Sequence, residues 1–474
     1  MEKFVVLAIL IPILGSMLLP FVGQAAVKLR NLLALLLIAA SFGASTALAG
    51  VVYSGRTINI DVPLILGFHL NLTADVLGVF MALSASLVGL LIVLYSFGYI
   101  HHYKNQNEYY FMVVLFLGAM MGLVYSKNLI FIYLFWEISA VCCWRLIGFF
   151  REREVVLRAD KAFLITVGGA LAMLLGFVII DSQYGTFNLN ELRGKSAPDL
   201  AVLLIMIGIF SKSATLPFHS WLPDAGVAPS PVTALLHAAV LVKIGVFVFA
   251  RIFVGTMVFS QFWHQVLPVV ITISAIATGG AALMESDIKR VIAYSTVSQL
   301  AFIFLGLLMR NQLAVTGGLL FIMYHAISKG GLFLCAGIIE HAMHTKDMRQ
   351  MGGLIKTMPV TALAFAFCSL SVMGIPPFGG FFGKYMIITG AIRDGFPWIA
   401  GFFILGSFLT ILYLLRVFAL VFMGEPQNGH LAKEGSATML AAVVLLAALS
   451  LITGLLVHFP SEFVQVAVRQ MIGS

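Results

Sequence analysis

The sequence predicts an all-α polytopic membrane protein with about 14 transmembrane helices. Of its 474 residues, 61% are hydrophobic and only 10% are charged, and its mean hydropathy is +1.04. Soluble globular domains do not have such a composition. Apolar windows of about 20 residues, the length that crosses a hydrocarbon core of roughly 30 Å, recur along the chain. Short polar connections separate them, so the chain crosses the membrane many times.

The predicted spans follow one another in chain order. The first six comprise residues 2–21, 31–53, 74–100, 110–125, 128–150 and 159–181. The other eight comprise residues 200–222, 229–253, 264–284, 290–309, 313–340, 358–390, 398–423 and 437–458. The first span lacks a basic stretch followed by a small-residue cleavage site, so we expect a retained helix rather than a signal peptide. The residues after the last span are at most a short amphipathic segment.

Two segments interrupt the helical pattern in the same way. Residues 211–231, SKSATLPFHSWLPDAGVAPSP, place Lys212 before Pro217 and Pro223, and residues 374–384, GIPPFGGFFGK, place Lys384 after a Pro-Pro-x-Gly-Gly break. Proline removes an amide donor and glycine loosens the backbone, which a membrane helix tolerates only where the freed carbonyls face protein or water. Paired interruptions of this kind indicate inverted repeats with a transport path at their interface.

These breaks predict a division of the chain into four parts. The parts are N-terminal transmembrane helices 1–3 in residues 1–109, a first inverted repeat in 110–253, a second inverted repeat in 264–423, and a C-terminal transmembrane helix in 424–474. Each repeat is expected to form a half-channel. The alternative is that the prolines kink ordinary helices and the lysines extend to the membrane surface. It is weaker for Lys212, which lies about 12 residues, or roughly 18 Å, inside its span.

Five ionisable residues stand inside otherwise apolar spans: Glu137, Lys212, Lys243, Lys329 and Lys384. A charge at the centre of a spanning helix costs roughly 2.5–3.5 kcal/mol, so these groups must lie within protein or in a watery passage. Glu137 and Lys212 lie at comparable depths, which predicts an ion pair between them. Burial disfavours the ammonium form of lysine and a nearby carboxylate restores it, so a shift of this pair would capture or release a proton.

Histidines accompany two of the other lysines. His237 shares a predicted helix with Lys243, and His325 lies four residues before Lys329, on the same helical face. An imidazole in that position can exchange a proton with the amine, directly or through one water molecule. The alternative is that each histidine only makes a hydrogen bond between helices. The recurrence of lysines in four helices favours a proton relay.

The sequence offers no site for other chemistry. All four cysteines lie in apolar segments without metal-site spacing, and we expect them to pack in the core. The adjacent His101 and His102 have no third ligand nearby in the sequence, so we predict no metal. There is no dinucleotide fingerprint, phosphate loop or nucleophile elbow, and no basic stripe with interleaved aromatic residues. We therefore predict no cofactor, no catalytic residue and no binding of nucleic acid.

The distribution of lysine and arginine predicts the orientation. Basic residues are more frequent in the odd-numbered connections than in the even-numbered ones. By the positive-inside rule, both termini then face outward from the cell inner (plasma) membrane. The net charge of +8 is therefore interpreted as a signal of topology.

Several motifs together resemble a known family. They are FWEISAVCCWRLIG, SKSATLPFHSWLPDAGVAPSPVTALLHAAVLVKIG, ESDIKRVIAYSTVSQLAF, HAISKGGLFL and MGGLIKTMPVTALAFAFCSLSVMGIPPFGGFFGKY. They are similar to the antiporter-like membrane subunits of respiratory complex I, of energy-converting membrane-bound hydrogenases including formate hydrogenlyase, and of multisubunit (Mrp-type) sodium/proton antiporters. The resemblance covers roughly residues 70–425. It implies 14 helices with two inverted five-helix repeats, each containing a discontinuous helix.

The resemblance also implies roles for individual residues. Glu137 and Lys212 would be the coupling pair of the first half-channel, and Lys384 would exchange protons with the far side of the membrane. The residues that would form the hydrophilic axis between them are Lys243, His325 and Lys329, together with His219 and His237. The implied partners are other membrane subunits of the same family and a peripheral redox module, a hydrogenase or dehydrogenase.

Two features depart from the commonest complex I pattern. Arg145 falls eight residues after Glu137, where an uncharged residue is expected, and its side chain should extend to the membrane surface. The chain also ends soon after the last predicted span, whereas the most distal such subunit of complex I continues into a long lateral helix. We therefore do not expect this chain to occupy that position.

Three functions are compatible with these observations. The first is the proton-translocating subunit of a redox-driven membrane complex, either a complex I-like NADH:quinone oxidoreductase or an energy-converting hydrogenase. The second is a subunit of a multisubunit sodium/proton antiporter, since both branches share the motifs. The third is a membrane scaffold whose lysines only hold helices together. The residues suit protons, but a glutamate or backbone carbonyls could also bind sodium.

Overall fold

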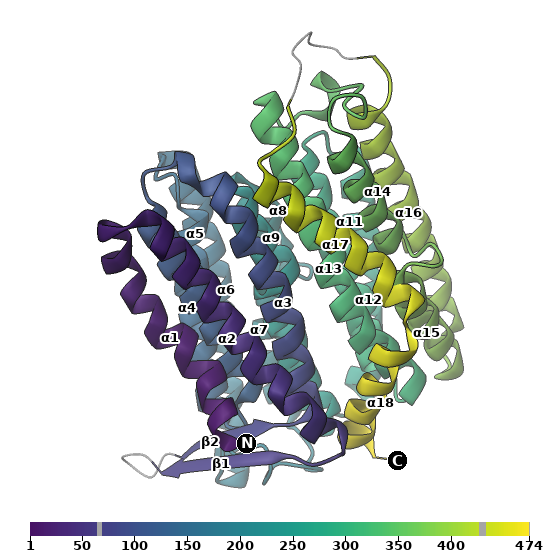
Figure 1. Cartoon of the computed structure of the whole chain (residues 1–474). Helices are drawn as coiled ribbons and strands as arrows, with labels where there is room; N and C mark the ends of the chain where they lie inside the picture. The colour runs from purple at the N-terminus through teal and green to yellow at the C-terminus, as the bar shows by residue number, and fades with distance from the viewer. Residues whose placement is uncertain (64–68, 426–432, 474) are drawn as a thin grey trace.

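The computed structural model describes residues 1–63, 69–425 and 433–473. Within them, long helices run side by side as a bundle, and both chain termini lie at the same end (Figure 1). We call that end the terminal face and the opposite end, where α1 gives way to α2, the distal face. Twelve helical segments of the described chain are long and apolar enough to cross a membrane. The protein is a multi-pass membrane protein.

The helices that precede the first break form one continuous series. They are α1 (Glu2–Ala25), α2 (Val27–Tyr53), α3 (Val76–Tyr99), α4 (Gln106–Tyr125), α5 (Leu129–Ile147), α6 (Arg153–Tyr184) and α7 (Asp199–Lys212). Short pieces follow α7: η3 (Phe218–Ser220), α8 (Trp221–Asp224) and η4 (Ala225–Val227). One further helix then crosses the bundle as α9 (Ser230–Ala234), the π-turn η5 (Leu235–Ala239), α10 (Leu241–Phe249) and the π-turn η6 (Ala250–Val254).

The second half of the chain follows a similar plan. It contains α11 (Gln261–Met284), α12 (Ile288–Leu308), α13 (Gln312–Met343), α14 (Pro359–Met373), α15 (Gly379–Arg393), α16 (Pro397–Phe422), α17 (Ala437–Leu455) and α18 (His458–Ile472). The predicted interruptions are present after α7 and between α14 and α15. Because α7, α14 and α15 have only 14 or 15 residues each, they fall short of a full span, and the predicted count of about 14 is not confirmed.

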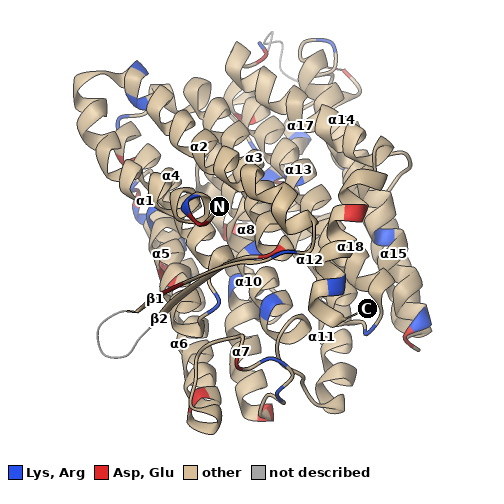
Figure 2. Cartoon of the chain, turned by 60° about the horizontal axis from the view of Figure 1, so that its bottom comes forward, with Lys and Arg blue, Asp and Glu red and all other residues tan. Residues whose placement is uncertain are grey.

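Two elements were missed by the hydropathy prediction. The strands β1 (Ile58–Pro63) and β2 (His69–Ala74) form an antiparallel hairpin in which Ile58 pairs with Ala74. This hairpin lies across the terminal face, as Figure 2 shows. α18 is a further helix beyond the last predicted span. Neither element is a long apolar window, so a search for windows of about 20 residues does not find it.

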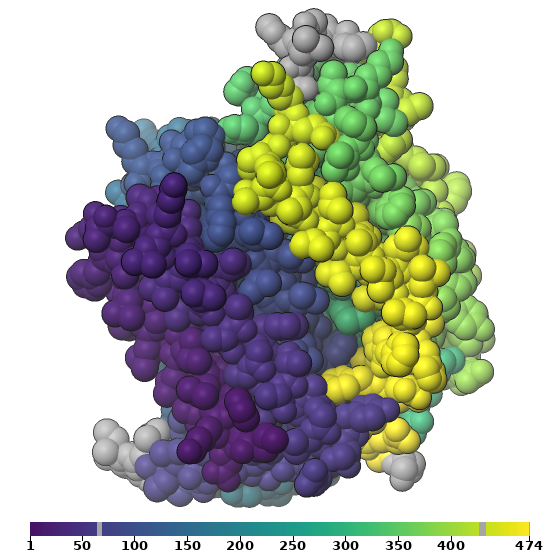
Figure 3. All heavy atoms as spheres, viewed as in Figure 1, coloured from purple at the N-terminus to yellow at the C-terminus, as the bar shows by residue number. Residues whose placement is uncertain are grey.

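α17 connects the N-terminal helices with the second half of the chain. It packs against α3 on one side and against α13, α14 and α15 on the other. Figure 3 shows α17 and α18 as a continuous band across one face of the molecule, between the N-terminal helices and the second half. The four cysteines are buried and unpaired, which confirms that they pack in the core.

Matching pairs of backbone hydrogen bonds occur at both faces. Before α5, Leu129 N–H donates to Phe187 O (3.0 Å) and Leu189 N–H donates to Lys127 O (2.9 Å). Before α12, Ile288 and Met348 make the same two bonds, to the carbonyls of Lys346 and Ser286 (both 3.0 Å). α5 starts at the terminal face and α12 at the distal face, so the two pairs of bonds are related by inversion. Two inverted repeats would produce this pattern, although the boundaries 110–253 and 264–423 remain a prediction.

A buried ion-pair cluster at the terminal face ties three parts of the chain together. Asp75 caps α3 by accepting from Gly78 N–H (2.8 Å), and it pairs with Arg251 of η6 and with Lys127 (3.2 Å), which precedes α5. Burial alone would raise the pKa of Asp75, but Arg251, Lys127 and the Gly78 amide together hold it well below its usual range. The cluster therefore stabilises the fold only while Asp75 is ionised.

Asp75→Asn should lower the thermal stability of the protein in detergent. The change leaves Arg251 without a buried countercharge, which typically costs about 3–5 kcal/mol. The loss should appear at neutral pH and shrink in acid below about pH 3.9, where an unfolded aspartate is protonated. The control is Asp61→Asn on the hairpin, where the carboxylate is exposed, pairs with His69 and accepts a hydrogen bond from Asn71. Equal melting temperatures for the two variants at pH 7 would contradict this prediction.

Candidate functional site

The first part of the first broken helix ends at a lysine, and side chains make hydrogen bonds to backbone groups at the break. Lys212 is the last residue of α7, the helix end at which the dipole favours a cation. The Trp221 indole donates to Ser211 O (2.9 Å), and Leu216 N–H donates to Ser274 Oγ (3.3 Å). Backbone groups freed by the break thus have partners inside the protein, as the membrane interior requires.

The predicted ion pair between Glu137 and Lys212 is not formed in this structure. Lys212 Nζ instead donates to Trp136 O (3.2 Å) and lies 5.1 Å from the centre of the Trp136 ring. Glu137 Oε1 has no hydrogen-bond partner within the described residues. The two residues are neighbours, because Trp136 directly precedes Glu137. However, the lysine donates to the backbone of α5 rather than to the carboxylate.

Glu137 belongs to the outward-facing side of α5. Leu134 and Val141, one turn before it and one turn after it, are 48% and 46% exposed. Glu137 is itself partly exposed on this stripe. A carboxylate at this depth is costly in contact with lipid. The protein itself buries the Oε1 atom of Glu137, which limits this cost.

The centre of the bundle holds a compact polar cluster. Lys243 Nζ lies 2.5 Å from His325 Nδ1 and donates to His237 O (3.2 Å). The three residues come from η5, α10 and α13, and all are at most 1% exposed. Both ring nitrogens of His237 lack a hydrogen-bond partner in the described part of the chain. Buried polar atoms of this kind are normally satisfied by water.

Lys329 is held by groups that the sequence did not single out. Its Nζ donates to Ser295 Oγ (2.5 Å) and to Ile292 O (3.1 Å), both on α12. Ser295 also makes a 2.6 Å hydrogen bond with the hydroxyl of Tyr413 on α16. Ser295 stands within the segment ESDIKRVIAYSTVSQLAF, but neither it nor Tyr413 was assigned a role, because only the fold brings them to the lysine.

Lys384 has a different environment. It lies near the N-terminal end of α15, and its Nζ makes no hydrogen bond to the described residues. The ammonium instead sits 4.6 Å from the centre of the Phe302 ring and 5.8 Å from that of Phe321, within the range of cation–π attraction. Lys212 thus lies at the C-terminal end of its helix, where the dipole favours a cation, whereas Lys384 is the sixth residue of α15 and lies beyond its first turn.

The predicted residues fall into two groups and one outlier. Lys212 and Glu137 form the first group, beside α5. The second group, here called the central row, comprises His237, Lys243, His325, Lys329 and Lys384. His325 lies within electrostatic range of the other four. His219 lies apart in η3, with its ring 6.5 Å from that of Tyr294. No carboxylate of the described chain pairs with a lysine of the central row within 4 Å, so its groups can exchange protons but offer little to a metal ion.

Arg145 also has a clear place. It forms an ion pair with Glu108 at the distal end of α4, and Arg151 donates to the other carboxylate oxygen (2.6 Å). The arginine does reach the end of its helix, as expected, but it is anchored there by a carboxylate. It makes no contact with Lys212 or with the central row.

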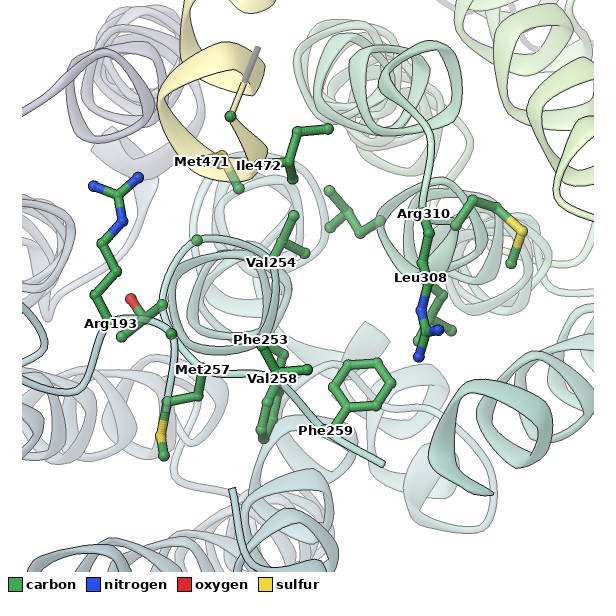
Figure 4. A pocket seen from close by; sticks show the side chains of 16 residues that line it. Arg193, Phe253, Val254, Met257, Val258, Phe259, Leu308, Arg310, Met471 and Ile472 are labelled. Carbon is green, nitrogen blue, oxygen red and sulfur yellow. The ribbon is translucent and has the colours of Figure 1, made fainter. Parts of the chain in front are cut away.

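A separate cavity of about 510 Å³ opens near the terminal face. In Figure 4 it lies between the loop after η6, the end of α12 and the end of α18. Its labelled lining residues are Arg193, Phe253, Val254, Met257, Val258, Phe259, Leu308, Arg310, Met471 and Ile472. None of the predicted site residues lines it, so cavity size alone would not have located the central row.

A helical bundle with two discontinuous helices and a buried row of lysines defines a class, the antiporter-like membrane subunits. The chain belongs to the family described as "NADH:quinone oxidoreductase/Mrp antiporter, TM", whose model matches residues 126–410. A second model, "NADH-Ubiquinone oxidoreductase (complex I), chain 5 N-terminus", matches residues 65–110. The resemblance drawn from the sequence motifs is confirmed.

Among curated proteins, the chain is 34% identical over 437 residues to Na(+)/H(+) antiporter subunit A1 of Staphylococcus haemolyticus (strain JCSC1435). The match covers 84% of this chain and 54% of that relative. The corresponding subunit of Staphylococcus aureus (strain JH9) is 34% identical over 428 residues, covering 82% and 53%. The chain thus spans about half the length of the curated relatives it matches.

Solved structures share the fold. A chain of the Mrp complex from Dietzia sp. DQ12-45-1b matches with a TM-score of 0.92 and 22% identity, covering 100% of this chain and 98% of that one. A chain of the membrane-bound sulfane sulfur reductase, an archaeal respiratory complex, has a TM-score of 0.89 and 22% identity, with coverage of 99% and 97%. A chain of respiratory complex I from Thermus thermophilus has a TM-score of 0.86 and 22% identity, with coverage of 99% and 100%.

Lys384→Met should leave the melting temperature in detergent unchanged or raise it. An unpaired charge in the protein interior destabilises the fold, so replacing it by an apolar side chain of similar volume should be neutral or stabilising. Thermal unfolding of the purified protein measures the effect, with Asp75→Asn as the positive control for destabilisation. A drop as large as that of Asp75→Asn would show that Lys384 is retained for stability.

Proposed function

We propose that this chain is an ion-translocating subunit of a multisubunit membrane complex and that protons are the ions it carries. The observation behind the proposal is the central row itself, in which Lys243, Lys329 and Lys384 are at most 4% exposed within membrane helices. Each buried charge is costly. Because the stability of the fold does not require three unpaired lysines, we infer that they are retained for transport.

The proposed path uses the residues in a definite order. Glu137 and Lys212 act as the switch of the first half-channel, and His237, Lys243, His325 and Lys329 connect the halves. Lys384 is the outlet. A cavity of about 360 Å³ near the terminal face is lined by Met386 and Arg393 of the same helix as Lys384, which supports an outlet on that side. His219, in the first break, would serve the switch from the distal side.

The switch needs no covalent step. In this structure Lys212 is held by the Trp136 carbonyl while Glu137 is free of it, which corresponds to a separated pair. If Glu137 turns toward Lys212, its negative charge stabilises the ammonium form and favours capture of a proton. Separation has the opposite effect. Moving one proton against about 100 mV takes roughly 2.3 kcal/mol, which is within the energy of separating one such pair at low dielectric.

Protons suit the central row better than sodium does. Sodium is a hard cation that binds through carboxylates, carbonyls and water, whereas the row presents amines and imidazoles. Glu137, beside α5, is the one predicted path residue with carboxylate oxygens. If sodium is carried, we infer that it is handled beside Glu137 or by a partner subunit.

Two drivers are open to the complex. The curated relatives are named Na(+)/H(+) antiporter subunits, which favours exchange of protons for sodium. The description of the matching family also includes NADH:quinone oxidoreductase, which keeps a redox-driven complex with a peripheral hydrogenase or dehydrogenase as the second candidate. In both cases the partners are other membrane subunits. The outward side of α5, with Glu137 between exposed Leu134 and Val141, is the surface we assign to one of them.

The distribution of basic residues between the two faces indicates the orientation in the membrane. Basic residues in the connections between α1 and α2, α5 and α6, α11 and α12, and α13 and α14 lie at the distal face. By the positive-inside rule, we propose that the distal face is cytoplasmic and that both termini lie outside the plasma membrane. The outlet at Lys384 then opens to the outside.

Proton movement in membrane vesicles tests the function. We expect Lys212→Met and Lys384→Met to assemble into the complex but to reduce proton translocation at least tenfold, because each removes a group that must bind the proton in turn. Lys28→Met, at an exposed site on the distal face, should translocate like the wild type. A pH-sensitive dye reports the flux, with a protonophore to define zero.

The same vesicles separate the two drivers. Translocation that depends on added sodium supports an antiporter, and translocation driven by an electron donor without sodium supports a redox-driven complex. Unchanged translocation in Lys384→Met would remove this lysine from the path. Full translocation in both lysine variants would leave only the scaffold function.

A further inference from the structure

Two neighbouring helices carry polar groups from the distal face to the central row. Every residue from Ser230 to Phe253 is buried, and this segment brings Ser230, His237 and Lys243 down from the distal face. α13 runs the opposite way and packs against it. Lys329 lies in its middle, and Glu340 lies eleven residues later, about 16 Å further toward the distal face.

Glu340 is the carboxylate at the distal end of these two helices. Its side chain is 20% exposed, and it pairs with Lys289 of α12 (2.5 Å) and with Lys346 (3.3 Å), which follows α13. Lys289 is only 1% exposed and also donates to Ala228 O (3.3 Å). Glu340 therefore touches water on one side and a buried cation on the other.

A third contact of Glu340 points into the bundle. Ser230 Oγ donates to Glu340 Oε2 (3.2 Å) and also lies 3.4 Å from the hydroxyl of Tyr99. Thr233 donates to Ser230 O (2.8 Å), which continues the polar side of the helix inward. His237 follows two turns below Ser230, about 10 Å away, and its ring nitrogens are free of protein partners in the described chain.

The surroundings of Glu340 contain other titratable groups. Lys289 and Lys346 face it from α12 and from the loop after α13, and Tyr95, Tyr99 and Tyr103 lie close enough to sense its charge. No second carboxylate of the described chain pairs with Lys289 or Lys346. Glu340 is thus the acidic group placed between bulk water and the central row.

We propose that Glu340 takes up protons at the distal face and passes them inward to the central row. The proposal rests on the proton-translocating function proposed above. The carboxylate accepts one proton from water, becomes neutral and leaves Lys289. It then gives that proton through Ser230 and intervening water to His237, and returns as a carboxylate to Lys289 and Lys346. The cycle transfers one proton inward and restores the ion pairs.

A purely structural role for Glu340 makes a different prediction. If it only neutralises Lys289, then removing both charges at once should restore the protein, because no buried charge is left unpaired. If it carries protons, removing Lys289 as well cannot replace the missing carboxylate. The double variant Glu340→Gln with Lys289→Gln therefore separates the two roles.

The test measures proton translocation by the whole complex in vesicles and, in parallel, its melting temperature. We expect Glu340→Gln to lose at least tenfold in translocation. The double variant should regain the wild-type melting temperature but not the flux, and Glu340→Asp, which keeps a titratable carboxylate, should retain more flux than Glu340→Gln. The matched control is Glu108→Gln, which also removes a carboxylate paired with two cations at the distal face and should leave the flux unchanged.

Two other outcomes would overturn the proposal for Glu340, and a third would overturn the proposed function. Wild-type flux in the double variant would reduce Glu340 to a counter-ion and overturn the proposal. An equal loss in Glu108→Gln would show that any ion-paired carboxylate at this face has the same effect, and would also overturn it. Absence of proton flux in the wild-type complex would instead overturn the proposed function, so the two failures are distinguishable.

Discussion

The arrangement of this protein depends on where its buried cations have carboxylate partners. Near the terminal face, Arg251 and Lys127 share Asp75, and near the distal face Lys289 and Lys346 share Glu340. Between them, within the described chain, the lysines of the central row meet a histidine, hydroxyl and carbonyl groups or aromatic rings. The paired ends stabilise the bundle, because breaking a buried pair is costly. The unpaired middle adds little stability but contains groups whose charge is easily changed.

The two broken helices support this division of roles. Lys212 ends the half-helix α7 and donates to a carbonyl of α5, whereas Lys384 lies in the second turn of α15, against phenylalanine rings. A carbonyl and an aromatic ring hold an ammonium group differently. A hydrogen bond to a carbonyl is directional, whereas a cation–π contact with a ring face is not. Lys212 is therefore positioned by a directional partner, whereas Lys384 is not.

Much of this structure could be predicted from the sequence. Apolar windows located the long helices, and prolines with adjacent glycines located both interruptions, because these signals are local. The hairpin of β1 and β2 was missed, since six-residue strands are no apolar window. The pairing of Glu137 with Lys212 was inferred from their depths and from the family resemblance, and neither says which way a side chain turns. Glu340 was not singled out because it is the last residue of a predicted span, where a charge is ordinary, and because its partner Lys289 lies in the connection between the predicted spans 264–284 and 290–309.

The π-turns η5 and η6 lie on either side of Lys243. Each π-turn holds one residue more than an α-turn, and such turns are frequent at functional sites. If one residue passes from η5 to η6, α10 rotates by about 100° and shifts by about 1.5 Å, while the helix ends stay in place. The ammonium group of Lys243 would then leave His325 and face another neighbour. A small local rewinding, contained within one membrane helix, can thus make and break the contact at the centre of the protein.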